Sequence, residues 1–189
     1  MADRDGMGAI ADGEAEARLL ARLDALAIAW RLHRHPPLRT VAESRRLRGT
    51  VPGLHSKNLF LKDKAGRYAL IVVEESASVD LKAIAAALGL GRPSFAGSGD
   101  LMRMLGIVPG AVTPFALMNA RAAADAPPPL ALALDRGLAK AAMVNFHPLH
   151  NRATLTISGK DLLRFIEAEG YRPVLFDFER SGGREEQES

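Results

Sequence analysis

The sequence predicts a single α/β domain in which helices flank a mixed β-sheet. The chain has 189 residues, of which 48% are hydrophobic, so it can bury one substantial core. Strand-like and helix-like segments alternate irregularly along it, with close hairpins among longer crossovers. That order favours a sheet with both parallel and antiparallel neighbours over a regular series of parallel βαβ units.

The two ends of the chain are predicted to be disordered around one folded unit. Residues 1–13 and the acidic tail at 180–189 are polar and lack periodicity, which leaves a domain at 14–179. The domain is expected to open with a helix over 14–30. Its apolar positions recur at helical spacing, at 19, 20, 23, 26, 27 and 30.

A short basic helix is predicted after the first one. Pro36 and Pro37 exclude helical geometry just before them and therefore end the first helix. The capping-box pattern of Thr40 and Glu43 then opens a helix that runs to about Leu47.

A hairpin and two helices should follow. The segments 58–63 and 68–75 are strand-like, and Gly66 lies in the turn between them. Two further segments have helical patterns, each closed by a glycine: 78–88 before Gly89, and 98–105 before Gly106.

The second half of the chain adds strands and one capped helix. Ser158 and Asp161 form another capping box, and the helix that they open should end at Gly170. The predicted strands lie at 115–120, 130–135, 141–146, 153–158 and 173–178.

Charge is concentrated in one stretch of the sequence. The formal net charge is only +3, but six arginines stand between Arg31 and Arg48 against the single acid Glu43. Such a patch can attract a polyanion; it is equally typical of a solvated helix face. The chain has no cysteine, no apolar signal segment and no long apolar run. We therefore expect a cytoplasmic protein without disulfides or a membrane span.

Several catalytic classes are excluded by their missing motifs. His33 and His35, and likewise His147 and His150, match neither HExxH nor a zinc-finger spacing, so no metal site is predicted. The sequence contains no GxSxG elbow, and its segment GLGRP lacks the GK[ST] ending of a phosphate-binding loop.

Three features remain as candidates for a site. Lys57 lies at the start of an apolar strand, although lysine is seldom buried unless it is paired. Its ammonium could await an anionic or carbonyl partner, or its side chain could snorkel to water. Strand parity puts Lys57 and Asn58 on opposite faces, so we expect the side chain of Lys57 at the site and only the backbone of Asn58 to take part. The loop from Pro109 to Pro114 combines glycine with proline and could present N–H groups, or be an ordinary turn. His147 lies in a polar group beside an apolar strand.

Four segments in order give the sequence a family resemblance. They are HPPLRTVAES, GLHSKNLFLKDKAGRYALIVV, LGIVPGAVTPFALMN and VNFHPLHNRATLTISGKDLLRFIEAEGY. Together they resemble the YbaK/prolyl-tRNA-synthetase-associated (INS-like) editing family. Within it, KNLFLKD, GAVTPFAL and FHPLHN resemble the freestanding alanyl-tRNA(Pro) deacylase branch, the ProXp-ala or PrdX type. The likeness runs from about Leu26 to Phe178; GSGDLMRML and the pair after Leu149 depart from the usual pattern.

The resemblance implies a fold and an activity. It implies a single domain with a twisted mixed sheet, which hydrolyses mischarged Ala-tRNA(Pro) in trans to alanine and tRNA(Pro), without metal or cofactor. The expected partner is tRNA(Pro), through its acceptor stem and CCA end; prolyl-tRNA synthetase or an elongation factor are further partners that it allows. Another mischarged tRNA (Cys-, Ser- or 2-aminobutyryl-tRNA) or a catalytically silent tRNA- or protein-binding module are the alternatives.

In the resemblance, the family's lysine matches Lys57, its GxxxP loop matches Gly110 to Pro114 and the histidine of its NFHP motif matches His147. From these matches and from the charge pattern we predict the following roles. Lys57 would contact the terminal adenosine or the aminoacyl end, and backbone groups of the Gly110 loop would orient water and stabilise the oxyanion. His147 would be an orienting residue or a general base. The other expected contacts are Asn58, Pro109, Thr113 and Pro114 to the substrate, and Arg45, Arg46 and Arg48 to tRNA phosphates.

Overall fold

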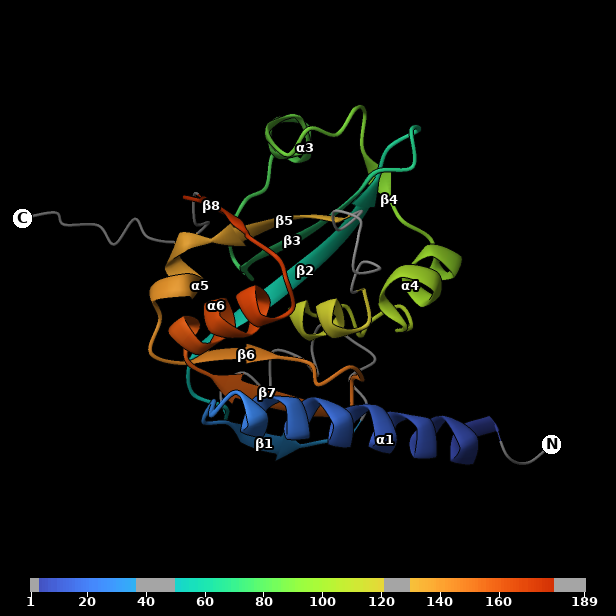
Figure 1. Cartoon of the computed structure of the whole chain (residues 1–189), viewed down its shortest axis with the longest axis vertical. Coiled ribbons are helices and arrows are strands. Elements are labelled where there is room, and N and C mark those ends of the chain that lie inside the picture. Colours follow the sequence, from blue (N-terminus) through green and yellow to red (C-terminus); the bar gives the residue numbers. More distant parts are fainter. Residues whose placement is uncertain (1–3, 37–49, 121–129, 179–189) are drawn as a thin grey trace, which may run out of the picture.

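One mixed β-sheet organises the molecule. The computed structural model describes residues 4–36, 50–120 and 130–178. In this part of the chain the strands follow the order β1-β7-β6-β2-β3-β5-β8, and β4 pairs with β2 (Figure 1). Their bounds are β1 Arg31–Arg34, β2 Leu54–Lys62, β3 Tyr68–Glu74, β4 Ser94–Phe95, β5 Leu130–Asp135, β6 Val144–Phe146, β7 Ala153–Ile157 and β8 Val174–Phe176.

Both kinds of strand pairing occur, so the predicted mixed sheet is confirmed. The pairs β2–β3, β6–β7 and β1–β7 are antiparallel. The pairs β2–β6, β3–β5 and β5–β8 are parallel. The strands turn relative to one another across the sheet (Figure 1), as the right-handed twist of extended backbone requires.

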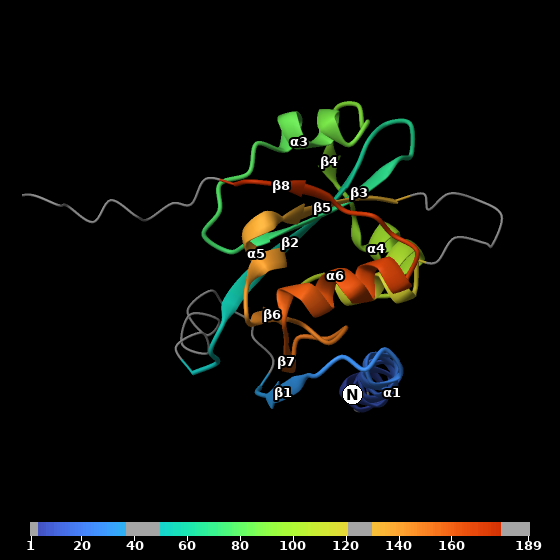
Figure 2. The same cartoon turned by 60° about the vertical axis from the view of Figure 1, so that its left-hand side comes forward.

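Helices cover the sheet on both faces. The helices are α1 Arg4–Ala25, α3 Leu81–Ala87, α4 Ser98–Leu105, the 3₁₀ helix η1 Pro114–Met118, α5 Arg136–Lys140 and α6 Gly159–Ala168. The larger core joins α1, α4, η1, α5 and α6 to one face, with Phe115 and Phe165 fully buried in it. The smaller core lies under α3 on the other face, around Ile71 and Val73. Figure 2 shows α3 and α6 on opposite sides of the strands.

The N-terminal part of the prediction needs correction. Helix α1 begins at Arg4, well before Glu14, and ends at Ala25 instead of at Trp30. Ala27 has a φ of 49°, a left-handed conformation that no helix continues through. The chain then becomes extended and forms β1, which pairs with β7. The apolar residues after Ala25 therefore have helical spacing without being helical. They pack against the core from the segment that leads into β1.

The predicted hairpin and the helices after it are confirmed. β2 and β3 form the hairpin, and their turn is organised by Asp63, whose carboxylate accepts from the backbone N–H groups of Ala65, Arg67 and Gly91 at 2.9–3.0 Å. These amide hydrogen bonds lower the pKa of Asp63 to about 2. Helix α3 is capped by Asp80, and α4 ends at Gly106.

One predicted strand is wrong, and one predicted helix lies outside the description. Residues 115–120 were expected as a strand but belong largely to η1, because Thr113 caps it and Pro114 occupies its first position. The predicted helix at 40–47 lies outside the described residues. Helix α6 begins after its cap Ser158, as predicted.

Candidate functional site

The candidate site lies where two parallel strands separate. β2 and β6 pair at only two positions, Leu54 with Val144 and His55 with Asn145. Beyond them β6 ends at Phe146, whereas β2 continues to Lys62. Ser56 Oγ donates to the Asn145 carbonyl at 3.1 Å and is the last link between the strands that the structure gives. The sheet therefore opens beside the next residue on the Ser56 face of β2, which is Asn58.

The loop predicted to carry the chemistry contacts β2 at this opening. Asn58 Nδ2 donates to the Val112 carbonyl at 2.9 Å and lies 3.4 Å from Ser56 Oγ. Within the loop, Pro109 and Gly110 are exposed. Gly110 has a φ of 86°, and none of the described residues lies within 4 Å of the position that a Cβ would occupy there. Glycine is thus required there for backbone conformation, and the space beside it is free for a ligand.

The second half of the loop is held by the core. Thr113 is fully buried, and its hydroxyl accepts from the Phe115 N–H at 3.4 Å. Phe115 in turn contacts Phe146 and Phe165 edge to face. Thr113 and Pro114, predicted as substrate contacts, therefore stand beneath the loop surface and fix its shape.

One polar atom of the Asn58 side chain takes part in no hydrogen bond with the described residues. Its Oδ1 is buried and has no hydrogen-bond partner in the described part of the chain. The orientation of the amide follows from its neighbours, because the Val112 carbonyl can only accept and must face Nδ2. An unpaired buried acceptor costs about 1–3 kcal/mol, so a ligand that donates a hydrogen bond to Oδ1 gains affinity once the loop moves to expose this atom.

Lys57 lies on the other side of the sheet. Its Nζ donates to the Ala77 carbonyl, and Ala77 belongs to the smaller core under α3. The predicted parity of Lys57 and Asn58 is therefore confirmed. The structure brings Asn58, and not Lys57, to the loop.

His147 begins the turn between β6 and β7. It is half-buried, and its Nδ1 lies 3.3 Å from the Ala153 carbonyl. This contact places the ring proton on Nδ1 and leaves Nε2 with no hydrogen-bond partner among the described residues. Burial lowers the pKa of His147 below its ordinary value of 6.5, so the ring is neutral at pH 7 and Nε2 can accept a proton.

Other polar groups around the opening support the strands. Asn145 is buried, donates to the Pro52 carbonyl at 3.1 Å and accepts from Thr156 Oγ1 at 2.6 Å. Ser56 was not predicted as a site residue, although it lies two residues before Asn58 and therefore shares its strand face. Arg45, Arg46 and Arg48 lie outside the described residues.

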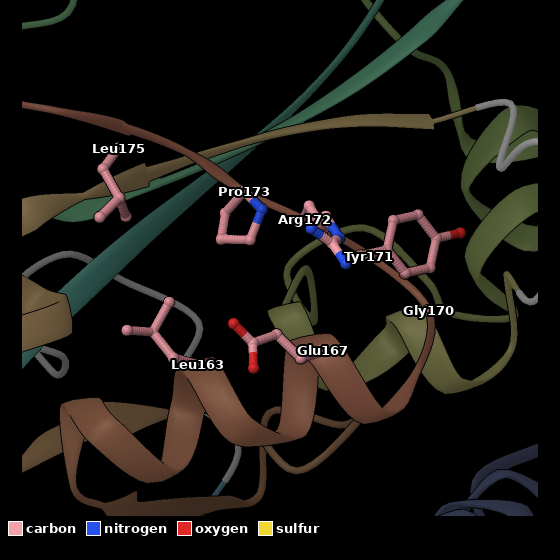
Figure 3. Close-up of a pocket in the computed structure, with 7 residues that line it drawn as sticks. All are labelled: Leu163, Glu167, Gly170, Tyr171, Arg172, Pro173 and Leu175. Atoms are coloured by element: carbon pink, nitrogen blue, oxygen red, sulfur yellow. The ribbon is translucent and has the colours of Figure 1, made fainter.

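A hollow elsewhere on the molecule is separate from this opening. It has a volume of about 620 Å³ and lies between α6 and the segment that leads into β8 (Figure 3). Its lining includes Leu163, Glu167, Pro173 and Leu175 and none of the predicted site residues. In the described part of the chain, no three His, Asp or Glu side chains are grouped as a metal ion requires. None of the described helices has the length and apolar character needed to span a membrane.

Known proteins are similar to this chain over most of its length. The model of the aminoacyl-tRNA editing domain matches residues 35–165. The prolyl-tRNA editing protein ProX of Acetoanaerobium sticklandii is 32% identical over 160 residues, which cover 84% of this chain and 94% of that protein. The prolyl-tRNA synthetase associated domain-containing protein 1 of Bos taurus is 34% identical over 179 residues, which cover 91% of this chain and all of that protein.

Solved structures share the fold. A hypothetical protein, APE2540, superimposes with a TM-score of 0.62 at 26% identity, over 82% of this chain and 95% of that one. A proposed trans-editing enzyme for prolyl tRNA synthetase superimposes with a TM-score of 0.64 at 20% identity, over 89% of this chain and 98% of that one. From the matched model and these relatives, the chain belongs to the aminoacyl-tRNA editing domain family.

Proposed function

We propose that this chain is a trans-editing deacylase, acting in the cytoplasm, that hydrolyses Ala-tRNA(Pro) to alanine and tRNA(Pro). The observation that carries the proposal is the buried, unpaired Oδ1 of Asn58 beside the loop at 110–114. An aminoacyl ester has an ammonium group two bonds from its carbonyl carbon. That ammonium can donate the hydrogen bond that the amide oxygen of Asn58 does not receive from the described residues.

The reaction needs positioning more than strong chemistry. A water oxygen bonds to the ester carbonyl carbon, and the bond from this carbon to the ribose oxygen breaks. One water proton ends on the ribose oxygen, and the new carboxyl group releases the other to solvent. With the ammonium on Asn58 Oδ1, backbone N–H groups of the exposed Gly110 turn would face the carbonyl oxygen and stabilise its developing charge.

His147 and Lys57 have different places in the proposal. The neutral His147 ring has an Nε2 without a partner among the described residues, and this atom can take a proton from water if the turn borders the bound ester. Lys57 would meet the RNA end electrostatically, which requires its ammonium to leave the Ala77 carbonyl. Of the two neighbours on β2, the geometry supports Asn58 more directly.

Which small amino acid is released depends on the space beside the loop. Alanine would be accepted and proline rejected if the wall near Val112 excludes the proline ring, because a steric wall rejects a larger side chain sharply. Phosphate contacts from Arg45, Arg46 and Arg48 would position the acceptor stem.

A panel of mischarged tRNAs tests the proposal. Purified protein is incubated with labelled Ala-, Ser-, Cys- and 2-aminobutyryl-tRNA(Pro) and with Pro-tRNA(Pro), and the release of each amino acid is followed. We expect Ala-tRNA(Pro) to be hydrolysed fastest and Pro-tRNA(Pro) to survive. Faster release of another amino acid would reassign the substrate, and release of none would leave a silent binding module.

A further inference from the structure

Helix α1 holds the turn that carries His147 through a buried carboxylate. Glu16 is 5% exposed, and its Oε2 lies 3.0 Å from Nε2 of His150, which is also 5% exposed. Glu16 Oε1 accepts from Arg34 Nη2 at 2.6 Å. A carboxylate is rarely buried unless it is paired. The three side chains come from α1, the β6–β7 turn and β1, so they join three segments at one point; Figure 1 shows α1 lying along β1 and β7.

Hydrogen bonds at both ring nitrogens fix the orientation of His150. The backbone N–H of Arg152 donates to His150 Nδ1 at 3.1 Å, so this nitrogen is an acceptor. The ring proton therefore lies on Nε2 and is donated to Glu16. The ring cannot rotate without breaking one of these bonds, and through it Glu16 fixes the middle of the turn.

The turn has a strained residue directly before His150. Leu149 has a φ of 71°, in the left-handed region that a leucine rarely adopts. Such a conformation persists only when the surrounding structure holds it. Here the side chain of Leu149 is buried in the larger core, and the Glu16–His150 hydrogen bond holds the next residue.

We infer that Glu16 is a positioning residue for His147. By holding His150, it keeps the β6–β7 turn in the conformation in which His147 Nδ1 meets the Ala153 carbonyl and Nε2 is left free. The catalytic consequence rests on the proposed function, because the ring affects the rate only if this turn borders the ester.

Three variants test the inference in deacylation of Ala-tRNA(Pro). In Glu16→Ala we expect kcat to fall roughly 10- to 100-fold with KM nearly unchanged, as for a misplaced catalytic group. Glu16→Gln keeps an acceptor oxygen for His150 Nε2 and should retain most of the activity. Asp12→Asn is the matched control, because Asp12 lies on the same helix and pairs with Arg152 of the same turn at 3.6 Å; its kcat should stay at the wild-type value.

A measurement on the folded protein separates this inference from the proposed function. Nitrogen NMR of the His147 ring should show the Nδ1–H form in the wild type and a mixture of both neutral forms in Glu16→Ala. His150→Leu cuts the same hydrogen bond from the other side and should behave alike, which keeps the test valid if one variant fails to fold. A wild type that hydrolyses none of the mischarged tRNAs refutes the proposed function alone. An unchanged His147 ring in both variants, or an unchanged kcat in an active enzyme, overturns the role of Glu16.

Discussion

Replacing Asn58 by leucine should separate stability from activity. The substitution removes the buried, unpaired Oδ1, which relieves about 1–3 kcal/mol in the free protein. It also removes the 2.9 Å hydrogen bond to the Val112 carbonyl, and leaving this acceptor without its partner costs about 1–3 kcal/mol. The two effects nearly cancel, so the free energy of unfolding should stay within about 2 kcal/mol of the wild type.

Activity, in contrast, should fall clearly. A hydrogen bond from an ammonium to the Asn58 oxygen is worth about 1.5–3 kcal/mol. Its loss lowers kcat/KM for Ala-tRNA(Pro) by roughly 10- to 150-fold, since 1.4 kcal/mol corresponds to a factor of ten. Urea unfolding followed by circular dichroism gives the stability, and single-turnover deacylation gives the rate.

Asn58→Asp is the matched control. It keeps an acceptor where Oδ1 lies but turns a second carboxylate oxygen toward the Val112 carbonyl, so it should be less stable than the wild type. If Asn58→Leu loses more than about 3 kcal/mol of unfolding free energy, Oδ1 is already satisfied in the free protein. If it deacylates Ala-tRNA(Pro) at the wild-type rate, the amide does not hold the substrate.

Four further predictions concern separate parts of the molecule. Lys57→Ala should lose deacylation of Ala-tRNA(Pro) while its unfolding curve stays cooperative; full activity would remove Lys57 from the site. If His147 is the general base, log kcat should decline at acidic pH, below 6.5 because burial lowers the pKa of His147, and His147→Asn should lack this limb. Because the folded-state pKa of Asp63 is about 2, its contribution to stability is present above pH 4 and is lost as the pH falls toward 2. Acid unfolding of Asp63→Asn should therefore depend less on pH in that interval, and an unchanged dependence would contradict the assignment. Replacing Arg45 and Arg48 together by alanine should weaken tRNA binding and flatten its salt dependence; an equal salt slope would place the binding surface elsewhere.

Local patterns predicted most of the elements but not the contacts between them. The β2–β3 hairpin, the cap at Ser158, and the opposite faces of Lys57 and Asn58 all depend on neighbouring residues, and the structure confirms them. Residues 115–120 were misassigned because an apolar run fits a strand and a buried helix equally well. There, Thr113 as cap and Pro114 at the first position were the better signals.

The arrangement of the candidate site could not be derived from the sequence. Strand parity says that Lys57 and Asn58 face apart, but not which of them meets a loop 54 positions further on. The pairing of Glu16 with His150 joins residues separated by 134 positions, and nothing near either one indicates it. Such contacts follow from the order of strands in the sheet.

Strand β2 belongs to two separately packed layers. Its side chains alternate between the core under α3 and the core that supports the loop at 110–114. The layer under α3 can therefore be redesigned for thermal stability, for example at Ile84, with the opposite layer left as it is. Conversely, the loop and its aromatic support can be varied to test substrate choice without changing the layer under α3, because they lie in the other layer. Apart from Lys57, whose ammonium bonds the Ala77 carbonyl in the layer under α3, the two layers can therefore be varied separately.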